Sequence, residues 1–112
     1  MDCIFCKIAD GLIPSDTVYE DDCIKAFRDI APQAPVHILV IPKVHVESTD
    51  DIKGKNSYLV ARVFEKIPAI AKAAGLTNGY RVITNCGPDA AQSVKHLHFH
   101  IVGGTKLSEK MV

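Results

Sequence analysis

Apolar residues recur along this chain with two different periods, and the two periods predict a β-sheet covered by a helix. Runs of strand length, alternating or continuously apolar and bounded by turn-forming residues, occur at 16–20, 23–30, 36–41, 80–84 and 93–102. The run 36–41 is nearly continuously apolar, which is typical of a central, buried strand. Asp21-Asp22 between the first two runs predicts a hairpin turn.

The segment 56–74 has the helical period instead. Its apolar residues follow each other at intervals of three and four positions and so share one face: Leu59, Val60, Val63, Phe64, Ile67, Ile70, Ala71 and Ala74. Gly75 is suited to end this helix, and Pro68 should kink it or divide it into two pieces, because proline has no N–H to donate. A second, short helix capped by Asp2 is expected before the turn at Asp10-Gly11.

Three of the five histidines stand at every second position of the run 93–102. In a strand, alternate side chains share a face, so His96, His98 and His100 should line one side while their apolar neighbours pack into a core. Positions four apart in a strand lie about 13 Å from each other, so the three rings cannot all bind one metal ion. Two neighbouring rings could do so, or one ring could act as a nucleophile or base. A partly exposed polar face is the plainer alternative.

The composition indicates a single domain that folds on its own core, because the chain has 112 residues. Its 13 Lys and Arg residues balance 13 Asp and Glu residues without a block of like charge, which argues against binding of nucleic acid by bulk electrostatics. The opening residues lack a basic region followed by a long apolar run, and no later segment approaches membrane-spanning length. We therefore expect a cytoplasmic protein that has neither nucleic acid nor a membrane as a partner.

In a cytoplasmic chain, the four cysteines are more plausibly thiols or metal ligands than disulfides. Cys23 and Cys86 are isolated and are expected to pack as small apolar groups. Cys3 and Cys6 are spaced so that one helical turn brings both thiols to one side. A structural zinc site needs four ligands, and His45 with one of the three alternating histidines could complete it. Two unliganded thiols are the alternative that the spacing leaves open.

Polar residues at three other places could serve a site beside the histidine run. His37 interrupts the buried run 36–41 and needs a polar partner there. Asp29 ends the second run, where a carboxylate could bind ribose hydroxyls or be an ordinary solvated residue. The loop 85–93 is small and polar, and its backbone N–H groups, with the Asn85 amide and the Ser93 hydroxyl, could surround an anion. An ordinary connection between strands is the alternative.

Taken together, the order and spacing of these motifs resemble the histidine triad family over residues 3–104. The matching segments are Gly87-x-x-Ala90-x-Gln92-Ser93-Val94 followed by the three alternating histidines and Ile101-Val102-Gly103-Gly104, Phe27-x-Asp29-Ile30, Ala34-Pro35-x-His37, Pro42-Lys43-x-His45, and the opening Cys3-Ile4-Phe5-Cys6-Lys7-Ile8. Several ordered motifs match rather than a single pattern, which makes the resemblance specific.

The resemblance implies one HIT domain over residues 1–112, with a core of 3–104 and a short tail of 105–112. Its expected fold is α+β and HIT-like, with a five-stranded antiparallel sheet, one long helix and a short N-terminal helix. In this family two copies form a homodimer with a continuous sheet, so a homodimer is expected here as well.

The resemblance also implies that the protein binds a purine nucleoside monophosphate and reacts at its α-phosphorus. His98 is expected to attack phosphorus and form a nucleotidyl-histidine intermediate that water hydrolyses, with His100, His37 and Ser93 completing the catalytic set. Around the nucleotide we expect a carboxylate for the ribose (Asp29), apolar walls for the base (Phe5, Ile8, Ile13, Phe27 and Ile30) and polar groups near the phosphate (Asn85 and Gln92).

Bacterial members that this chain resembles use the Cys-x-x-Cys pair, the histidine after Pro-Lys and the first triad histidine to bind structural zinc. The resemblance therefore implies zinc held by Cys3, Cys6, His45 and His96, in a closed tetrahedral site without an open position for chemistry.

Several activities stay open within this resemblance. Ser93 favours a nucleoside monophosphoramidase, which releases AMP or GMP from P–N linked adducts, over a dinucleoside polyphosphate hydrolase, where threonine is usual. A nucleotide-binding interaction module with little turnover would use the same residues. A metalloenzyme with His96 and His98 as ligands of a catalytic zinc is a third alternative. Ala90-Ala91 replace the glycines of many relatives, and the tail 105–112 lacks the tryptophan of some, so the leaving group is not specified.

Overall fold

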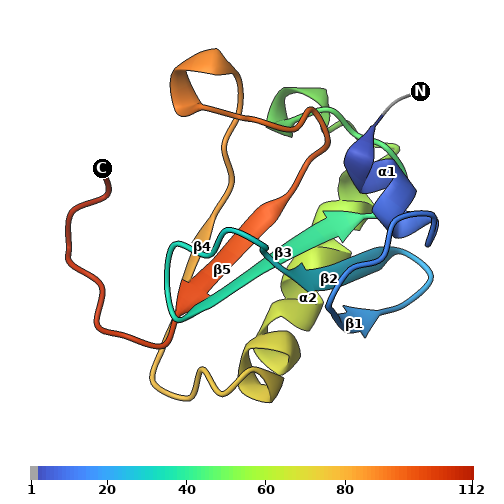
Figure 1. The fold of residues 1–112 in the computed structure, drawn as a ribbon. Helices are drawn as coiled ribbons and strands as arrows, with labels where there is room; N and C mark the ends of the chain where they lie inside the picture. Colours follow the sequence, from blue (N-terminus) through green and yellow to red (C-terminus); the bar gives the residue numbers. More distant parts are fainter. Residues whose placement is uncertain (1–2) are drawn as a thin grey trace.

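The computed structural model describes residues 3–112, and within them five strands form one antiparallel sheet (Figure 1). The strands are β1 (Thr17–Glu20), β2 (Ile24–Arg28), β3 (Val36–Pro42), β4 (Arg81–Ile83) and β5 (Phe99–Gly103). Their spatial order is β1-β2-β3-β5-β4, so β3 is central and β1 and β4 are the edges. The predicted α+β fold with a five-stranded antiparallel sheet is confirmed.

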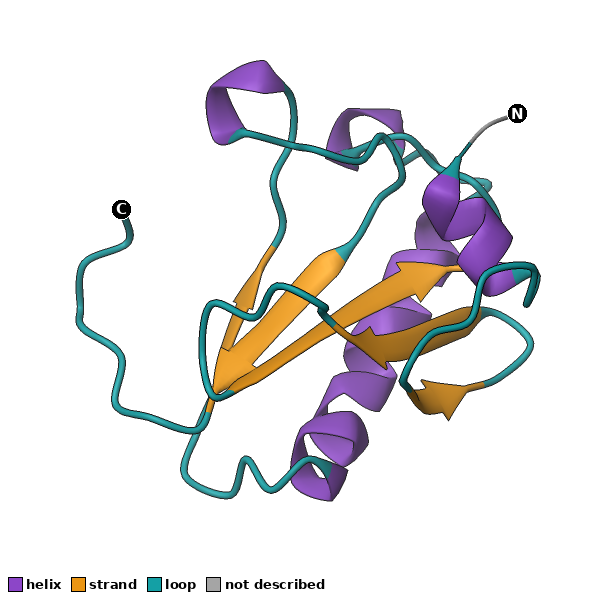
Figure 2. Ribbon diagram, viewed as in Figure 1, coloured by secondary structure: helices purple, strands orange, loops and turns teal. Residues whose placement is uncertain are grey.

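The helices α1 (Ile4–Ala9) and α2 (Ser57–Ala73) cover opposite faces of this sheet (Figure 2). Alternate residues of each inner strand explain the division, because Ile38 and Val40 of β3 pack with α2, whereas Leu39 and Ile41 pack with α1. The α2 side is a continuous apolar core, but α1 is short and covers only part of its face. The polar side chains on the uncovered part of that face are therefore available for binding or catalysis.

The long helix agrees with its predicted bounds to within one residue at each end. Its buried positions are Leu59, Val63, Ile67, Ile70 and Ala71, which are the predicted stripe without its flanking members. Pro68 lies inside α2, which nevertheless runs as one helix, so the expected division into two pieces is wrong. Pro68 is exposed, and packing of Ile67 and Ile70 on either side of it holds the helix against the sheet.

The histidine run is a strand only in its second half. β5 begins at Phe99, so His96 and His98 precede it, and the predicted strand over 93–102 is wrong in extent. The reason is that Leu97 N–H donates to Val46 O (2.6 Å), outside the β-ladder. The alternation itself is confirmed, because Leu97, Phe99 and Ile101 belong to the core under α2 while the histidines face the other way.

The short helix α1 is fixed at both ends. Cys3 is its N-cap residue, and its Sγ accepts a hydrogen bond from Cys6 N–H (3.3 Å); Asp2, the expected cap, lies outside the described residues. At the other end, the buried side chain of Lys25 donates to Ile8 O (2.9 Å). The first contact orders the turn that carries both cysteines, and the second holds the C-terminal end of α1 against the sheet.

The remaining segments are short 3₁₀ helices and loops. The 3₁₀ helices are η1 (Thr49–Asp51) and η2 (Pro88–Ala90), and η2 lies in the loop between β4 and β5. After β5 the tail extends away from the body, where Arg81 Nη2 donates to Ser108 O (2.6 Å) (Figure 1). Among the described helices, none has the length and apolar character needed to cross a membrane.

Candidate functional site

The polar face of the sheet brings all five histidines into two clusters and a single residue between them. The thiol–histidine cluster consists of Cys3, Cys6, His45 and His96, and the carboxylate–histidine cluster consists of Asp29, His37 and His100. In each cluster the potential ligand atoms lie within 4.8 Å of one another. His98 lies between the clusters, with its ring centre 5.1 Å from that of His100.

The thiol–histidine cluster has the dimensions of a tetrahedral metal site. His96 Nδ1 lies 3.4 Å from Cys3 Sγ, 3.5 Å from Cys6 Sγ and 3.2 Å from His45 Nδ1. His45 Nδ1 lies 3.3 Å from Cys6 Sγ. A tetrahedral zinc ion separates its sulfur and nitrogen ligands by roughly 3.3–3.8 Å. Two thiols and two imidazoles at these separations fit zinc.

Hydrogen bonding and burial also prepare His96 to bind a metal. Its Nε2–H donates to Pro42 O (2.8 Å), so the lone pair is on Nδ1 and faces the cluster. Burial lowers the pKa of His96, which keeps the ring neutral. Burial and then the neighbouring Cys3 raise the pKa of the Cys6 thiol to about 11, so a bound cation must displace its proton.

In the carboxylate–histidine cluster, by contrast, the nitrogen of His37 that faces its neighbours carries a proton. Gln33 N–H donates to His37 Nδ1 (3.0 Å), so the proton of the neutral ring is on Nε2. That Nε2–H donates to His100 Nδ1 (2.8 Å) and lies 3.4 Å from Asp29 Oδ2. A protonated nitrogen has no lone pair for a metal, so this group is a hydrogen-bond chain rather than a metal site.

The chain of hydrogen bonds ends at His100. Because Nδ1 of His100 accepts, its proton is on Nε2, and this buried N–H has no partner among residues 3–112. Burial, followed by the nearby His98 and His37 rings, lowers the pKa of His100 to about 4. The site therefore contains an uncharged N–H donor that is unpaired within the described chain, which is the kind of group that binds an oxyanion.

His98 has the tautomer of a nucleophile or a base. Its Nδ1–H donates to His96 O (2.6 Å), which leaves the lone pair on Nε2. The ring is buried and packs against the edge of the Phe5 ring, with 5.0 Å between ring centres. Thr84 Oγ1 donates to His98 O (2.8 Å) and so fixes the backbone at this residue.

The loop expected to hold a phosphate is ordered by one of its own predicted site residues. Gln92 accepts from Gly87 N–H (3.0 Å) and donates to Glu47 O (2.8 Å) and Val94 O (3.0 Å). These bonds use the Gln92 amide within the protein, so its contact with a ligand stays a prediction. Asn85 is half-buried in the same loop.

Ser93 is exposed at the edge of the thiol–histidine cluster. It lines a hollow of about 500 Å³ whose other lining residues include Cys3, His45, Glu47 and Lys95. Its hydroxyl forms no hydrogen bond with another residue of the described chain, 3–112. Ser93 is therefore available to a ligand, and no contact in the structure assigns its role.

The apolar residues expected around a base are largely grouped. Phe5, Ile8 and Phe27 are buried in one cluster with α1 on the polar side of the sheet, and Ile13 packs against it. Ile30 does not join them and is fully exposed on the connector after β2.

Sequence reasoning missed the groups that fix the ring protons. These are Gln33 N–H, Pro42 O and His96 O; sequence reasoning also missed the Thr84 hydroxyl, which bonds to the backbone carbonyl of His98. Three of the four are backbone groups, which every residue type can supply, so no residue-type signal could have identified them. Thr84 is the exception. It follows β4, which pairs with the start of β5, and this pairing brings Thr84 close to His98.

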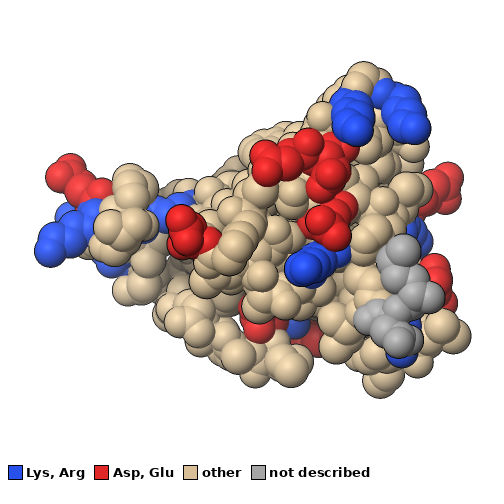
Figure 3. All heavy atoms as spheres, turned by 90° about the horizontal axis from the view of Figure 1, so that it is seen from above, with Lys and Arg blue, Asp and Glu red and all other residues tan. Residues whose placement is uncertain are grey.

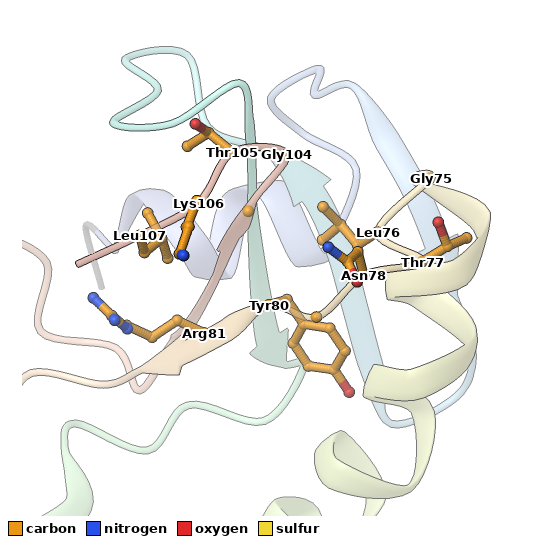
Figure 4. A pocket seen from close by; sticks show the side chains of 12 residues that line it. Gly75, Leu76, Thr77, Asn78, Tyr80, Arg81, Gly104, Thr105, Lys106 and Leu107 are labelled. Atoms are coloured by element: carbon orange, nitrogen blue, oxygen red, sulfur yellow. The ribbon is translucent and has the colours of Figure 1, made fainter. Parts of the chain in front are cut away.

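A larger hollow of about 700 Å³ lies away from the histidines, between the α2–β4 turn and the start of the tail. Figure 4 shows Tyr80, Arg81 and Lys106 around it. It contains none of the histidines or cysteines among its lining residues. The hollow therefore does not form part of the histidine site. On the face shown in Figure 3, acidic and basic side chains lie interspersed among uncharged residues.

Comparisons with known proteins agree with this geometry. The chain matches the HIT domain family over residues 10–107. It is 45% identical over 109 residues to the 14 kDa zinc-binding protein of Brassica juncea, with 96% of each chain covered. It is 44% identical to the adenylylsulfatase HINT1 of Arabidopsis thaliana, over 94% of this chain and 73% of that protein. A solved histidine triad protein from Clostridium difficile has a TM-score of 0.94 at 54% identity, covering 98% of this chain and 96% of that one.

Proposed function

The chain belongs to the HIT domain family, and from this premise we propose that it binds a purine nucleoside monophosphate group and hydrolyses a bond at its α-phosphorus. One observation carries the proposal. The Nδ1–H of His98 is bound to His96 O, which leaves a lone pair on His98 Nε2 beside the neutral N–H donor of His100. A nucleophile and an oxyanion donor side by side suit phosphoryl chemistry.

In the first step, the lone pair of His98 Nε2 attacks phosphorus, and the bond to the leaving group breaks; the leaving group keeps the electron pair and takes up a proton from solvent. The ring becomes positively charged, and the hydrogen bond to His96 O stabilises that charge. In the second step, water attacks phosphorus, the P–N bond breaks, and the electron pair returns to Nε2. The proton of the attacking water passes to solvent, and the nucleoside monophosphate is released.

The other residues of the polar face bind and orient the substrate. His100 Nε2–H donates to a phosphoryl oxygen, and His37 holds the His100 ring in the tautomer that makes this donation. Ser93 and Asn85 bind the phosphate or the leaving group, and Gln92 lies beside them. Asp29 retains acceptor capacity for ribose, although Oδ1 also accepts from Ala31 N–H (2.9 Å). The apolar residues Phe5, Ile8, Ile13 and Phe27 enclose the base, whereas the exposed Ile30 stands apart from this group.

We propose a nucleoside monophosphoramidate as the substrate, with a dinucleoside polyphosphate as the alternative. Ser93 favours the phosphoramidate, because threonine is usual at this position in the dinucleoside polyphosphate hydrolases of the family. The Arabidopsis thaliana relative is named an adenylylsulfatase, which supports hydrolysis at an adenylyl phosphorus with another leaving group. A catalytic zinc between His96 and His98 is disfavoured, because Nδ1 of His98 donates to a carbonyl while Nδ1 of His96 faces the thiols.

Zinc is proposed as a structural cofactor bound by Cys3, Cys6, His45 and His96. The distances and protonation described above fit it, and the Brassica juncea relative is named a zinc-binding protein. When bound, zinc neutralises the two thiolates and links the N-terminal helix to the sheet. All four ligands come from the protein, so no coordination position is left for a substrate.

A homodimer with a continuous sheet is proposed on the basis of the edge strand β4. Tyr80 and Ile83 at this edge, with Tyr58 and Phe64 on α2, are large apolar or aromatic side chains that are exposed. Pairing two β4 strands across a twofold axis would cover them. The protein is expected to act as a single domain in the cytoplasm, where its thiols stay reduced.

The test is an assay with an adenosine phosphoramidate, comparing wild-type protein with His98→Ala. We expect AMP release by the wild type and a loss of about a thousandfold or more in the variant. Turnover in a chelator-treated, folded wild-type protein that stays well above the rate of His98→Ala, even if it is reduced, separates covalent catalysis from a catalytic metal. An unchanged rate in His98→Ala would overturn the mechanism, and no turnover by the wild type would favour a binding module.

A further inference from the structure

His96 connects the thiol–histidine cluster to His98. Its ring is in the thiol–histidine cluster, where Nδ1 faces Cys3, Cys6 and His45 and Nε2–H donates to Pro42 O. Its backbone carbonyl accepts the Nδ1–H of His98 at 2.6 Å. His96 is completely buried, so any movement of the ring must also move neighbouring atoms of the chain.

A second connection passes through α1. Phe5 lies between Cys3 and Cys6 in the sequence, so both cluster thiols fix the helical turn that carries it. Its ring packs edge-on against His98 (5.0 Å between ring centres) and against His96 (6.0 Å). The ring of Phe27 supports Phe5 from β2 at 5.7 Å. The cluster therefore meets His98 through a carbonyl on one side and an aromatic ring on the other.

We propose that the thiol–histidine cluster is a positioning device for His98: its occupation by a metal ion holds the His96 carbonyl and the Phe5 ring where they keep His98 in one tautomer and one orientation. This inference rests on the proposed function of His98. On this proposal the bound metal affects the reaction through the position of His98, although the metal does not touch the substrate. Phe5 is accordingly a positioning residue as well as a wall of the proposed base site.

The anchoring of α1 shows where a metal-free protein would loosen. Lys25 holds the C-terminal end of α1 through Ile8 O, independently of the cluster. The N-terminal turn, by contrast, has the cysteines as its link to His45 and His96. Loss of the metal should therefore loosen the turn that contains Phe5, which then keeps only the packing of the Phe5 ring, while the rest of the helix stays docked.

The first test reads the tautomer of His98 without any substrate. Protein labelled with ¹⁵N-histidine is studied by NMR at one fixed pH, first loaded with zinc and then after removal of the metal with a chelator. We expect the zinc-loaded protein to show a protonated, slowly exchanging Nδ1 on His98. This signal should collapse to a mixture of tautomers without metal and return when zinc is added. An unchanged signal in a folded, metal-free protein would overturn the proposal.

The second test uses Phe5→Leu, which retains all four cluster ligands. If Phe5 positions His98, the rate of the first turnover at saturating substrate should fall roughly tenfold or more, whatever the change in the Kd for AMP. If Phe5 only encloses the base, the Kd should weaken and the saturating rate should persist, which would contradict the positioning role. Lys7→Ala, in the same helix but neither a cluster ligand nor part of the hollow beside Ser93, is the control and should change neither quantity.

The two tests also separate this proposal from the proposed function. If removal of zinc unfolds the protein, as circular dichroism would show, Phe5→Leu decides the positioning role, because that variant keeps its metal. If the NMR signal depends on zinc but wild-type protein has no turnover, the positioning holds and the proposed hydrolysis fails. If His98→Ala retains activity, the nucleophile is wrong whatever the NMR signal shows.

Discussion

The two clusters on the polar face contain similar residues, but backbone groups give them opposite chemistry. In the thiol–histidine cluster, His96 donates its outer N–H to Pro42 O and presents a lone pair to its neighbours. In the carboxylate–histidine cluster, His37 accepts from Gln33 N–H and presents a proton instead. The comparison teaches that the partner of the second ring nitrogen decides whether a histidine can bind a metal or donate to an oxyanion.

Loss of a ligand from the thiol–histidine cluster should have the largest effect. Cys6→Ser should reduce the zinc content and lower the free energy of unfolding, because the binding energy of a structural metal is folding energy. The loss should be about 4 kcal/mol when free zinc exceeds its dissociation constant a thousandfold. Metal analysis and chemical denaturation measure the two quantities. Cys23→Ser, a thiol outside both clusters, is the control, and equal zinc content in the two variants would contradict the assignment.

Truncation of the carboxylate–histidine cluster should instead affect the reaction. His100→Asn removes the buried Nε2–H that is unpaired within the described chain, and kcat should fall about a hundredfold, as when one oxyanion donor is removed. The zinc content should stay that of the wild type, because His100 is not among the cluster ligands. Steady-state kinetics and metal analysis of the same sample test both statements. A variant that loses zinc but keeps kcat would reverse the proposed division of roles.

A smaller effect should appear in the pH dependence of stability. The pKa of His100 is about 4 in the folded protein and about 6.5 in an unfolded chain. Between these values the unfolded chain takes up the proton first, so the contribution of His100 to stability is present above pH 6.5 and is lost as the pH falls toward 4. His100→Asn should have a shallower slope in this window, measured by denaturation at several pH values. Equal slopes would show that the ring is not held neutral.

The sequence predicted most of the fold because its two apolar periods are long and regular. The residues under α2 follow the predicted stripe, and the sheet contains all five predicted strands. The errors occur where single tertiary contacts override a local rule. Packing around the exposed Pro68 keeps α2 in one piece, and the bond from Leu97 N–H to Val46 O takes His96 and His98 out of β5.

For the candidate site, residue types indicated which side chains come together but not what each can do. Cys3, Cys6, His45 and His96 meet as the resemblance implied. The sequence could not indicate which nitrogen of each ring carries the proton, since this depends on backbone groups brought close by folding. Gln92 shows the same limit, because its amide is occupied by Gly87, Glu47 and Val94.

The most direct test of the central claim is to trap the covalent intermediate. Protein mixed briefly with an adenosine phosphoramidate is quenched so that P–N bonds survive, digested, and analysed by mass spectrometry. We predict an adenylyl group on the peptide that contains His98, absent in His98→Ala and retained in His100→Asn at a slower rate of formation. An adenylyl group on another residue, or full turnover without any labelled peptide, would contradict the account.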